Sequence, residues 1–355
     1  MQKQVSFALI TLILITTAVV SYISLEKGSS FLSKKENTSN HHHKNNASSS
    51  SFKKIAYINQ LSEWDGPKIL DAMGLNSPCY NVFILTFWMP GWVSDALSVW
   101  ENISTYISTT KYGKTDAEIQ KKILELFHAQ GKQLFISAFG GTDNPTGSDP
   151  VQIASQLADF VNRNPYIDGV DIDYEDNDAI VNGTGVTWLI TFQKALAEKI
   201  NNKNIIFTHA PQAPYFSRAY YDNGAYYTIE QEVGHLISWY NVQFYNQESD
   251  SYDSYEKLFL NSGAPFVNTS YQEIIEKDKI PISKLVLGKP ATPKDADNTG
   301  YVEPAELGKI CTEAQQKLGY NIPGFFIWEF INDQHCVFSN AFSKNYNPNA
   351  IKKTY

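Results

Sequence analysis

The sequence contains only three cysteines in 355 residues, and this number excludes a disulfide-rich scaffold because at most one bridge can form within the chain. Basic residues are also scarce, with 29 Lys and Arg compared with 37 Asp and Glu. The resulting net charge of -8 argues against a protein that binds nucleic acid. No cluster of His, Cys and carboxylate residues has the spacing of a metal site, so we expect neither a metal nor a cofactor. No Gly-x-Gly-x-x-Gly turn supports a dinucleotide-binding sheet.

The first 25 residues predict export from the cytosol. Lys3 precedes an uncharged, largely apolar run over residues 5–25, which exceeds the roughly 7–15-residue core of a signal peptide and approaches the length of a membrane span. A clean Ala-x-Ala site is lacking, and Ser21 and Ser24 are the candidate cleavage points. We predict either a cleaved signal peptide and a secreted protein, or an uncleaved signal-anchor that tethers a type II membrane protein with the remaining chain outside.

Residues 26–52 are rich in Ser, Asn, Lys and His, a composition that cannot bury a core. We predict a disordered stalk, in which His41, His42 and His43 form a solvated polar tract rather than a metal site. Five sequons suit a secreted eukaryotic glycoprotein. They begin at Asn37, Asn46, Asn102, Asn182 and Asn268.

From residue 53 to about residue 345, short apolar runs alternate with amphipathic stretches. Strands are predicted at 55–59, 82–87, 133–139, 169–175, 205–210, 237–245, 285–289 and 325–328. The clearest helices are predicted at 116–130, after a candidate cap at Thr115, at 151–162, after Asp149-Pro150, and at 187–200 and 304–318. This alternation predicts one α/β domain, a (β/α)8 TIM barrel over residues 53–345, with a tail at 346–355. A doubly wound sheet is the alternative.

The most informative segment is residues 168–175, Asp-Gly-Val-Asp-Ile-Asp-Tyr-Glu. Successive side chains of a strand point to opposite faces, so Asp171, Asp173 and Glu175 lie in a line on one face. The intervening Val, Ile and Tyr point the other way, as a strand buried on both sides requires. Repulsion between aligned carboxylates raises at least one pKa, and a carboxyl with a raised pKa can act as a general acid near neutral pH. In a barrel, the site lies where the strands end, as Glu175 does.

Two simpler interpretations of this segment are weaker. An acidic run is usually a solvated face, and a Ca²⁺ loop also gathers carboxylates. Calcium loops, however, are turns rich in Asn and Gly, whereas β-branched residues interleave these acids.

The 21 Tyr, 20 Phe and 7 Trp exceed what a core needs. Scattered core and surface positions explain part of the excess, but surplus aromatics often line grooves for sugars or other flat apolar faces.

The octapeptide resembles the Asp-Gly-x-Asp-x-Asp-x-Glu motif of glycoside hydrolase family 18, the chitinases. Further segments resemble the class III, hevamine-type branch of that family: Ala210-Pro211-Gln212, Val242-Gln243-Phe244-Tyr245-Asn246, Leu287-Gly288-x-Pro290-Ala291, Gly300-Tyr301-Val302-x-Pro304 and the strand-eight Trp328. The resemblance covers nearly all of residues 53–345. It departs on strand three, where Ala138-Phe139-Gly140-Gly141 replaces the family's Ser-x-Gly-Gly and Ser137 is shifted by one position.

The resemblance implies a substrate-assisted mechanism, in which the acetamido oxygen of the sugar attacks the anomeric carbon. Glu175 would act first as the general acid and then as the base that activates water. Asp173 would hydrogen-bond the acetamido N–H and stabilise the oxazolinium cation, and Asp171 would share a proton with Asp173. Tyr245 would donate to the acetamido oxygen.

Several further residues are candidates for binding the sugar. Trp328 is expected to form a platform under the sugar at the cleavage position, with barrel filling as the alternative. Gln243 is expected to point into the same cavity, and Trp88, just past strand two, is expected to line the groove. His209 is expected to be a satisfied core histidine. Three residues fit substrate contact and buried polar structure equally: Tyr57, Gln60 and Gln212.

Three functions fit this resemblance. The first is an endo-acting chitinase that binds chitin or N-acetylglucosamine oligosaccharides as a monomer. The second is an endo-β-N-acetylglucosaminidase that cuts the chitobiose core of N-glycans with the same motif. The third is a chitin-binding lectin, since family members that lose the terminal Glu act as lectins or inhibitors, but Glu175 and Tyr245 are intact here. The class III segments favour the first.

One disulfide is predicted, between Cys311 and Cys336. Helices of such a barrel run back from the site-bearing face, so the helix at 304–318 begins near that face and Cys311 lies about two turns in. Cys336 follows strand eight after it emerges at the same face. Cys79 precedes strand two at the opposite end, and is expected to stay unpaired.

Overall fold

The computed structural model describes residues 52–60, 77–106, 115–219, 221, 224–248, 251–319 and 321–350. The predicted signal segment, nearly all of the stalk with its histidine triplet, the sequons at Asn37 and Asn46, and the end of the tail lie outside these residues. Among the helices that are described, none is both long enough and apolar enough to cross a membrane.

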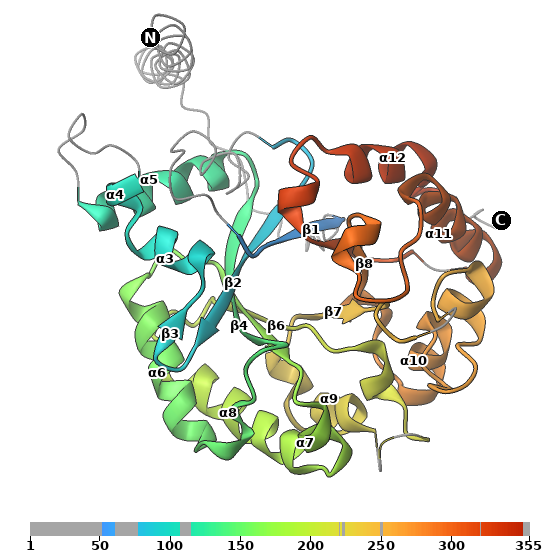
Figure 1. Ribbon diagram of the computed structural model, residues 1–355, viewed down its shortest axis with the longest axis horizontal. Coiled ribbons are helices and arrows are strands. Elements are labelled where there is room, and N and C mark those ends of the chain that lie inside the picture. The colour runs from blue at the N-terminus through green and yellow to red at the C-terminus, as the bar shows by residue number, and fades with distance from the viewer. Residues whose placement is uncertain are drawn as a thin grey trace, which may run out of the picture. The chain divides into compact units, whose positions relative to one another are not determined.

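Parallel strands close into a barrel surrounded by helices (Figure 1). The strands of the barrel are β1 (Lys53–Ile58), β2 (Val82–Met89), β4 (Gln133–Gly140), β5 (Gly169–Tyr174), β6 (Ile206–His209), β7 (Trp239–Gln243), β8 (Leu285–Pro290) and β9 (Gly324–Trp328). Each pairs with the next along the chain, and β9 pairs with β1, which closes the barrel. The short β3 (Trp92–Val93) adds an antiparallel hairpin at the end of β2. The predicted TIM barrel is confirmed.

The helices lie on the outside of the strands (Figure 1). They are α3 (Asp95–Glu101), α4 (Ile103–Tyr106), α5 (Asp116–Ala129), α6 (Pro150–Arg163), α7 (Asn177–Val181), α8 (Thr184–Lys199), α9 (Ala225–Val233), α10 (Tyr271–Asp278), α11 (Pro304–Leu318) and α12 (Val337–Asn345). Side-chain caps explain where two of the predicted helices begin. Thr115 forms a capping box with Glu118 at the start of α5, and Asp149 accepts from two backbone N–H groups ahead of Pro150 at the start of α6.

Two apolar cores follow from the alternation of side chains along the strands. The inner core fills the barrel with residues such as Ile55, Ile84 and Phe326. The outer core lies between the strands and the helices, and includes Ile172 of β5 and Leu196 of α8.

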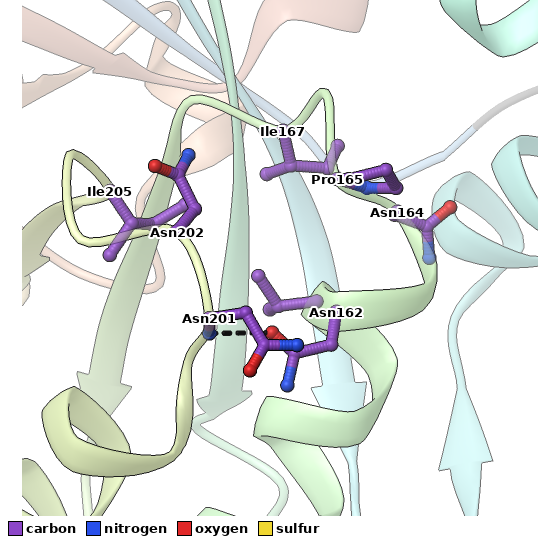
Figure 2. A pocket seen from close by; sticks show the side chains of 8 residues that line it. Asn162, Asn164, Pro165, Ile167, Asn201, Asn202 and Ile205 are labelled. Carbon is purple, nitrogen blue, oxygen red and sulfur yellow. Dashed lines mark hydrogen bonds between the residues drawn. The ribbon is translucent and has the colours of Figure 1, made fainter.

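The amino-terminal end of the barrel carries a small hollow, shown in Figure 2. It lies between the segments that precede β5 and β6, and asparagines make up half of its lining. These amides are partly engaged by backbone, since Asn162 Oδ1 accepts from Asn201 N at 2.9 Å and Asn164 Nδ2 donates to Phe160 O at 2.9 Å. Its volume of about 100 Å³ is below the roughly 300–1,000 Å³ of ligand pockets, and it contains no carboxyl group.

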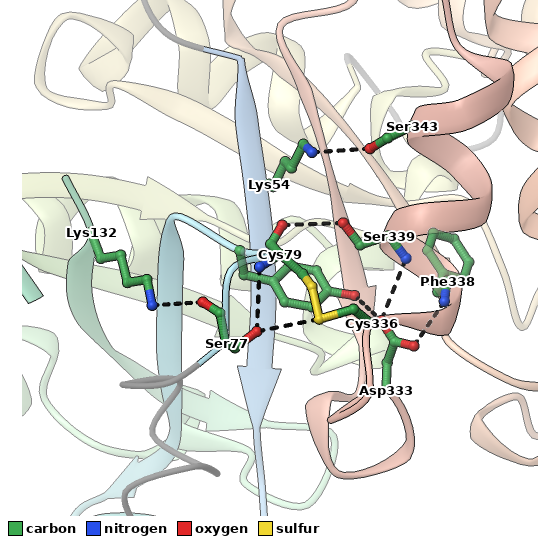
Figure 3. Close-up of a disulfide and its surroundings, with 10 residues drawn as sticks. Lys54, Ser77, Cys79, Lys132, Asp333, Cys336, Phe338, Ser339 and Ser343 are labelled. Carbon is green, nitrogen blue, oxygen red and sulfur yellow. Dashed lines mark hydrogen bonds between the residues drawn. A yellow bond between two sulfur atoms is a disulfide. The ribbon is translucent and has the colours of Figure 1, made fainter. Parts of the chain in front are cut away.

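The disulfide prediction is wrong: Cys336 pairs with Cys79, at a Cα separation of 5.8 Å (Figure 3). Cys311 is a buried free thiol. The error lies in the assumed path of the chain after β9. That segment returns along the outside of the barrel, where Asp333 accepts from Tyr80 OH and from Phe338 N. Because β1 is the neighbour of both β9 and β2, this return brings Cys336 beside the segment that leads into β2.

Contacts around the bridge hold the same two segments together. Ser339 Oγ of α12 donates to Cys79 O at 3.1 Å, and Ser77 Oγ lies 3.7 Å from Cys336 Sγ. Cys311 instead faces the outer core from the middle of α11.

Candidate active site

Strand β5 places the carboxylates as its period-two pattern predicts. Ile172 and Tyr174 belong to the outer core, so Asp171 and Asp173 point into the barrel. Both aspartates are buried, whereas Glu175, one residue beyond the strand, is half-buried. The acidic line therefore runs from the barrel interior to the carboxyl end of β5.

Asp171 lies deepest and is held by four hydrogen bonds. Its Oδ2 accepts from Tyr57 OH at 3.0 Å and from Ser137 Oγ at 2.8 Å. Its Oδ1 accepts from Thr208 Oγ1 at 2.6 Å and from Asn241 Nδ2 at 3.1 Å. Burial raises the pKa of Asp171, and these four donors act against that rise. With its acceptor sites occupied, Asp171 is a fixed group beneath Asp173.

Asp173 has the raised pKa that aligned carboxylates predict. Burial, then the charge of Glu175, then that of Asp171, raises the pKa of Asp173 well above its usual value, and a hydrogen bond between the Asp173 and Glu175 carboxyls acts in the same direction. That Asp171 shares a proton with Asp173 stays a prediction. Two hydroxyls, one phenol and one amide occupy the oxygens of Asp171.

Two glutamine amides hold Glu175 at the barrel mouth. Gln243 Nε2 donates to Asp173 Oδ1 at 2.9 Å and to Glu175 Oε1 at 3.3 Å. Gln212 Nε2 donates to Glu175 Oε2 at 3.1 Å, and Gln212 Oε1 accepts from Gln247 Nε2 at 3.2 Å. Gln243 and Gln212 thus fix the spacing of the two carboxyls and the orientation of Glu175.

Tyr245 follows β7 and has a hydroxyl available to a ligand. Its side chain is buried, and burial, followed by the charges of Asp173 and Glu175, raises the pKa of Tyr245 well above its usual value. The hydroxyl therefore stays protonated and can donate. Within the described residues, no hydrogen-bond partner occupies it.

Trp328 ends β9 at the same mouth of the barrel and is half-buried. Its indole stacks on Phe87, with ring centroids 5.9 Å apart and planes at 23°, and it lies 6.1 Å from the Tyr57 ring. This wall of aromatic rings stands at the rim of the inner core, to which Tyr245 belongs. It presents a flat apolar surface beside the carboxylates.

Two further candidate residues, Trp88 and Tyr57, are buried. Trp88 is buried in the outer core against Phe139, because a bulge between Leu85 and Trp88 shifts the register of β2. Phe87 takes the position at the mouth instead, so the prediction for Trp88 is corrected. Tyr57 is buried with its hydroxyl bonded to Asp171, which matches the buried-polar interpretation.

The remaining predicted residues are placed as follows. Gln60 is exposed just past β1. His209 is a satisfied core residue, because its ring nitrogens lie 3.1 Å from Tyr226 OH and 3.0 Å from Gln193 Oε1, and burial lowers its pKa to about 3. The altered strand-three segment still serves the site, because Ser137 bonds Asp171 and the backbone at Gly141 lies against Glu175.

Sequence reasoning missed four polar residues of the site. Thr208 and Asn241 lie two residues before Ala210 and Gln243, so the period-two rule applied to those strands would have found them. Gln247 lies beyond β7, where no periodicity applies. Glu329, directly after Trp328, is buried at the same end of the barrel, and its Oε2 accepts from Asn59 N at 3.2 Å. Burial, with the charge of Asp295 acting in the same direction, raises the pKa of Glu329 to about 7.

Over the described ranges, no group of three or more His, Cys, Asp and Glu side chains has an arrangement that could hold a metal ion. The polar groups gathered at the barrel mouth are the carboxyls, the Tyr245 hydroxyl and the amides of Gln212 and Gln243. One half-buried carboxyl, Glu175, beside one buried carboxyl of raised pKa, Asp173, is an arrangement suited to proton transfer at a bond placed in the barrel mouth.

Comparison with known proteins gives a consistent result. Residues 2–329 match the model of the glycosyl hydrolases family 18. A family 18 chitinase from Pseudoalteromonas aurantia is 25% identical, with a TM-score of 0.63 over 82% of this chain and 99% of that one. A fungal endo-β-N-acetylglucosaminidase of family 18 is 15% identical, with a TM-score of 0.58 over 84% and 99% of the two chains. A family 18 chitinase from Chromobacterium violaceum is 20% identical, with a TM-score of 0.57 over 83% of both chains. No curated protein matches the chain significantly.

Proposed function

Because the chain belongs to glycoside hydrolase family 18, we propose that it is an endo-acting chitinase, which hydrolyses β-1,4 bonds between N-acetylglucosamine units with retention of configuration. The observation that carries the proposal is the line of Asp171, Asp173 and Glu175, together with a buried, protonated Tyr245 hydroxyl in the same inner core. These groups suit a reaction in which the substrate's acetamido group is the nucleophile. The class III sequence segments favour the hevamine-type branch.

In the proposed first step, Glu175 gives its proton to the glycosidic oxygen as the bond to the anomeric carbon breaks. The acetamido oxygen forms a new bond to that carbon from the opposite face, which yields an oxazolinium ion. Asp173 accepts a hydrogen bond from the acetamido N–H and stabilises the cation, and Tyr245 OH donates to the acetamido oxygen. Trp328 supports the sugar ring from below.

In the second step, Glu175, now a carboxylate, takes a proton from a water molecule. The hydroxide forms its bond to the anomeric carbon and the bond to the acetamido oxygen breaks, which regenerates the acetamido group and the acid. Each step inverts the anomeric carbon, so the product retains the original configuration. The charge of Asp171 raises the pKa of Asp173. Gln212 and Gln243 hold Glu175 between the two steps.

An endo-β-N-acetylglucosaminidase is the second candidate, because the same groups would act on the chitobiose core of an N-glycan and one similar structure is a fungal enzyme of that kind. A chitin-binding lectin is disfavoured, since the acid and the tyrosine are both in place. The decisive experiment is to incubate the purified protein with N-acetylglucosamine oligomers and with a high-mannose glycoprotein, and to identify the products by mass. Shortened oligomers with an intact glycoprotein support the chitinase, and the reverse result would replace it with the second candidate.

The proposed setting is extracellular, by secretion or through a membrane tether over residues 5–25, with the protein a monomer. Three of the sequons lie in the described residues, where Asn102 and Asn182 are exposed and Asn268 is half-buried. Accessible asparagines support a glycoprotein. Treatment of the native secreted protein with an amidase that removes N-glycans, followed by mass measurement, tests this part of the proposal.

A further inference from the structure

Lys289 of β8 is a buried lysine that the mechanism above does not use. Its neighbour Gly288 faces the inner core, where an added Cβ would lie 1.9 Å from the Phe326 ring, so Lys289 points outward from the barrel. The side chain is fully buried. Burial lowers the pKa of Lys289 to about 7, against the opposing effects of Asp253 and Cys311. A buried ammonium is costly, and groups with strongly shifted pKa values cluster at functional sites.

The three N–H donors of Lys289 reach three backbone carbonyls, and these belong to the segments around Tyr245. Nζ donates to Phe244 O at 2.7 Å, to Tyr252 O at 2.7 Å and to Gly300 O at 3.0 Å. An ammonium has three donors and no acceptor, so the match is complete. One side chain therefore ties the end of β7 to the loop after β7 and to the loop after β8.

The backbone at Gly300 packs directly against the backbone of Tyr245. Gly300 has φ +93°, and a Cβ there would lie 2.4 Å from Tyr245 Cα. The loop backbone thus packs against the tyrosine with no space for a side chain. Asn246 N also donates to Thr299 O at 2.8 Å, which joins the same loop to the residue after Tyr245. The carbonyl before Tyr245 and the loop behind it are both fixed by Lys289.

We infer that Lys289 is a positioning residue for the reaction: its ammonium fixes the backbone on both sides of Tyr245 and so sets where the tyrosine hydroxyl meets the acetamido oxygen. This inference rests on the proposed function, in which Tyr245 acts on the acetamido group. A displacement of about 1 Å at a catalytic group can cost on the order of 10²-fold in rate, so loosening this backbone affects catalysis more than binding.

The test is a double-mutant cycle with Lys289→Met, Tyr245→Phe and the double variant, each assayed on N-acetylglucosamine oligomers. We expect Lys289→Met to lower kcat about 10-fold or more with KM within about 2-fold, and to weaken an N-acetylglucosamine thiazoline by a similar factor. In the Tyr245→Phe background the same change should cost less than about 2-fold, because the hydroxyl that Lys289 positions is already absent. If Lys289→Met does not fold, Lys289→Gln, which keeps two N–H donors, enters the cycle in its place.

The matched control is Lys284→Met, at the opposite end of β8. Lys284 Nζ also makes three hydrogen bonds, to both Glu230 carboxylate oxygens at 2.8 and 2.9 Å and to Gly234 O at 2.7 Å, but far from the mouth. It should lower the melting temperature and leave kcat unchanged. Additive losses in the cycle, or an equal kcat loss in the control, would overturn the role of Lys289 while the wild type remains active. A wild type inactive on oligomers and on glycoprotein would instead overturn the proposed function, and this inference with it.

Discussion

The replacement Glu175→Gln keeps the shape of the side chain and removes the proton that the proposed first step transfers. Positioned general acid catalysis contributes roughly 10²–10⁴-fold, or about 3–5 kcal/mol of the barrier. We therefore expect kcat on N-acetylglucosamine oligomers to fall by at least about 10²-fold. Because the binding groups are untouched, the affinity for an oligomer should change far less than kcat.

The structure also sets the stability change expected of this variant. The carboxylate accepts from Gln212 and Gln243, whereas a glutamine has one oxygen, so one of these amides loses its acceptor. A lost hydrogen bond costs about 1–3 kcal/mol when the donor is left buried, but water reaches the half-buried site. Removing the charge of Glu175 also removes one cause of the raised pKa of Asp173. The loss of this repulsion stabilises the folded state and opposes the cost of the lost hydrogen bond. The free energy of unfolding should change by about 1 kcal/mol or less.

The assay combines initial rates, an oligomer titration by calorimetry and a urea unfolding curve on the same preparation. The matched control is Asp176→Asn, because Asp176 is the next residue but caps α7 through Ala179 N. That variant should lose stability and keep its kcat. Glu175→Gln activity within a factor of ten of the wild type would remove Glu175 from the mechanism, as would a rate loss that only follows a large loss of stability.

Three further predictions follow from the same structure. Asp173→Asn should weaken an oxazolinium mimic such as allosamidin by about 10²-fold and plain oligomers much less, and equal losses would make Asp173 a structural residue only. Replacing Cys79 and Cys336 by Ser opens a loop of 257 residues, so the free energy of unfolding should fall by up to about 5–6 kcal/mol, and peptide mapping that finds a Cys311 cross-link would refute the pairing. Because the pKa of Glu329 rises from 4.5 to about 7 on folding, its contribution to stability is full below pH 4.5 and is lost as the pH rises to about 7. Glu329→Gln should thus gain about 1–3 kcal/mol relative to the wild type between pH 4 and pH 8, after allowance for solvent at the rim, and a pH-independent difference would exclude this titration.

The sequence predicted the parts of the site that a single strand determines. Period two along β5 fixed the faces of Asp171 and Asp173, and the strand end located Glu175. Phe87 could not be found in this way, because the bulge in β2 reverses the expected side of Trp88. A bulge depends on the register with the neighbouring strands, which a local pattern does not contain.

The fold was predictable for a similar reason, and the disulfide was not. Alternating apolar runs and caps report local structure, and they gave the strands and the helix starts to within a few residues. The bridge between Cys79 and Cys336 depends on how the last segment returns outside the closed barrel, a contact over 257 residues. The position of Lys289 is of the same kind, since its three carbonyl partners come from three separate segments.

The most direct measurement compares hydrolysis of an N-acetylglucosamine oligomer with that of the same oligomer after complete deacetylation, and follows the anomer first released by NMR. If the acetamido group is the nucleophile, only the acetylated oligomer is cleaved, and the first product carries the β configuration of the substrate. Equal cleavage of both oligomers, or release of the α anomer first, would contradict substrate-assisted retention at Asp173 and Glu175.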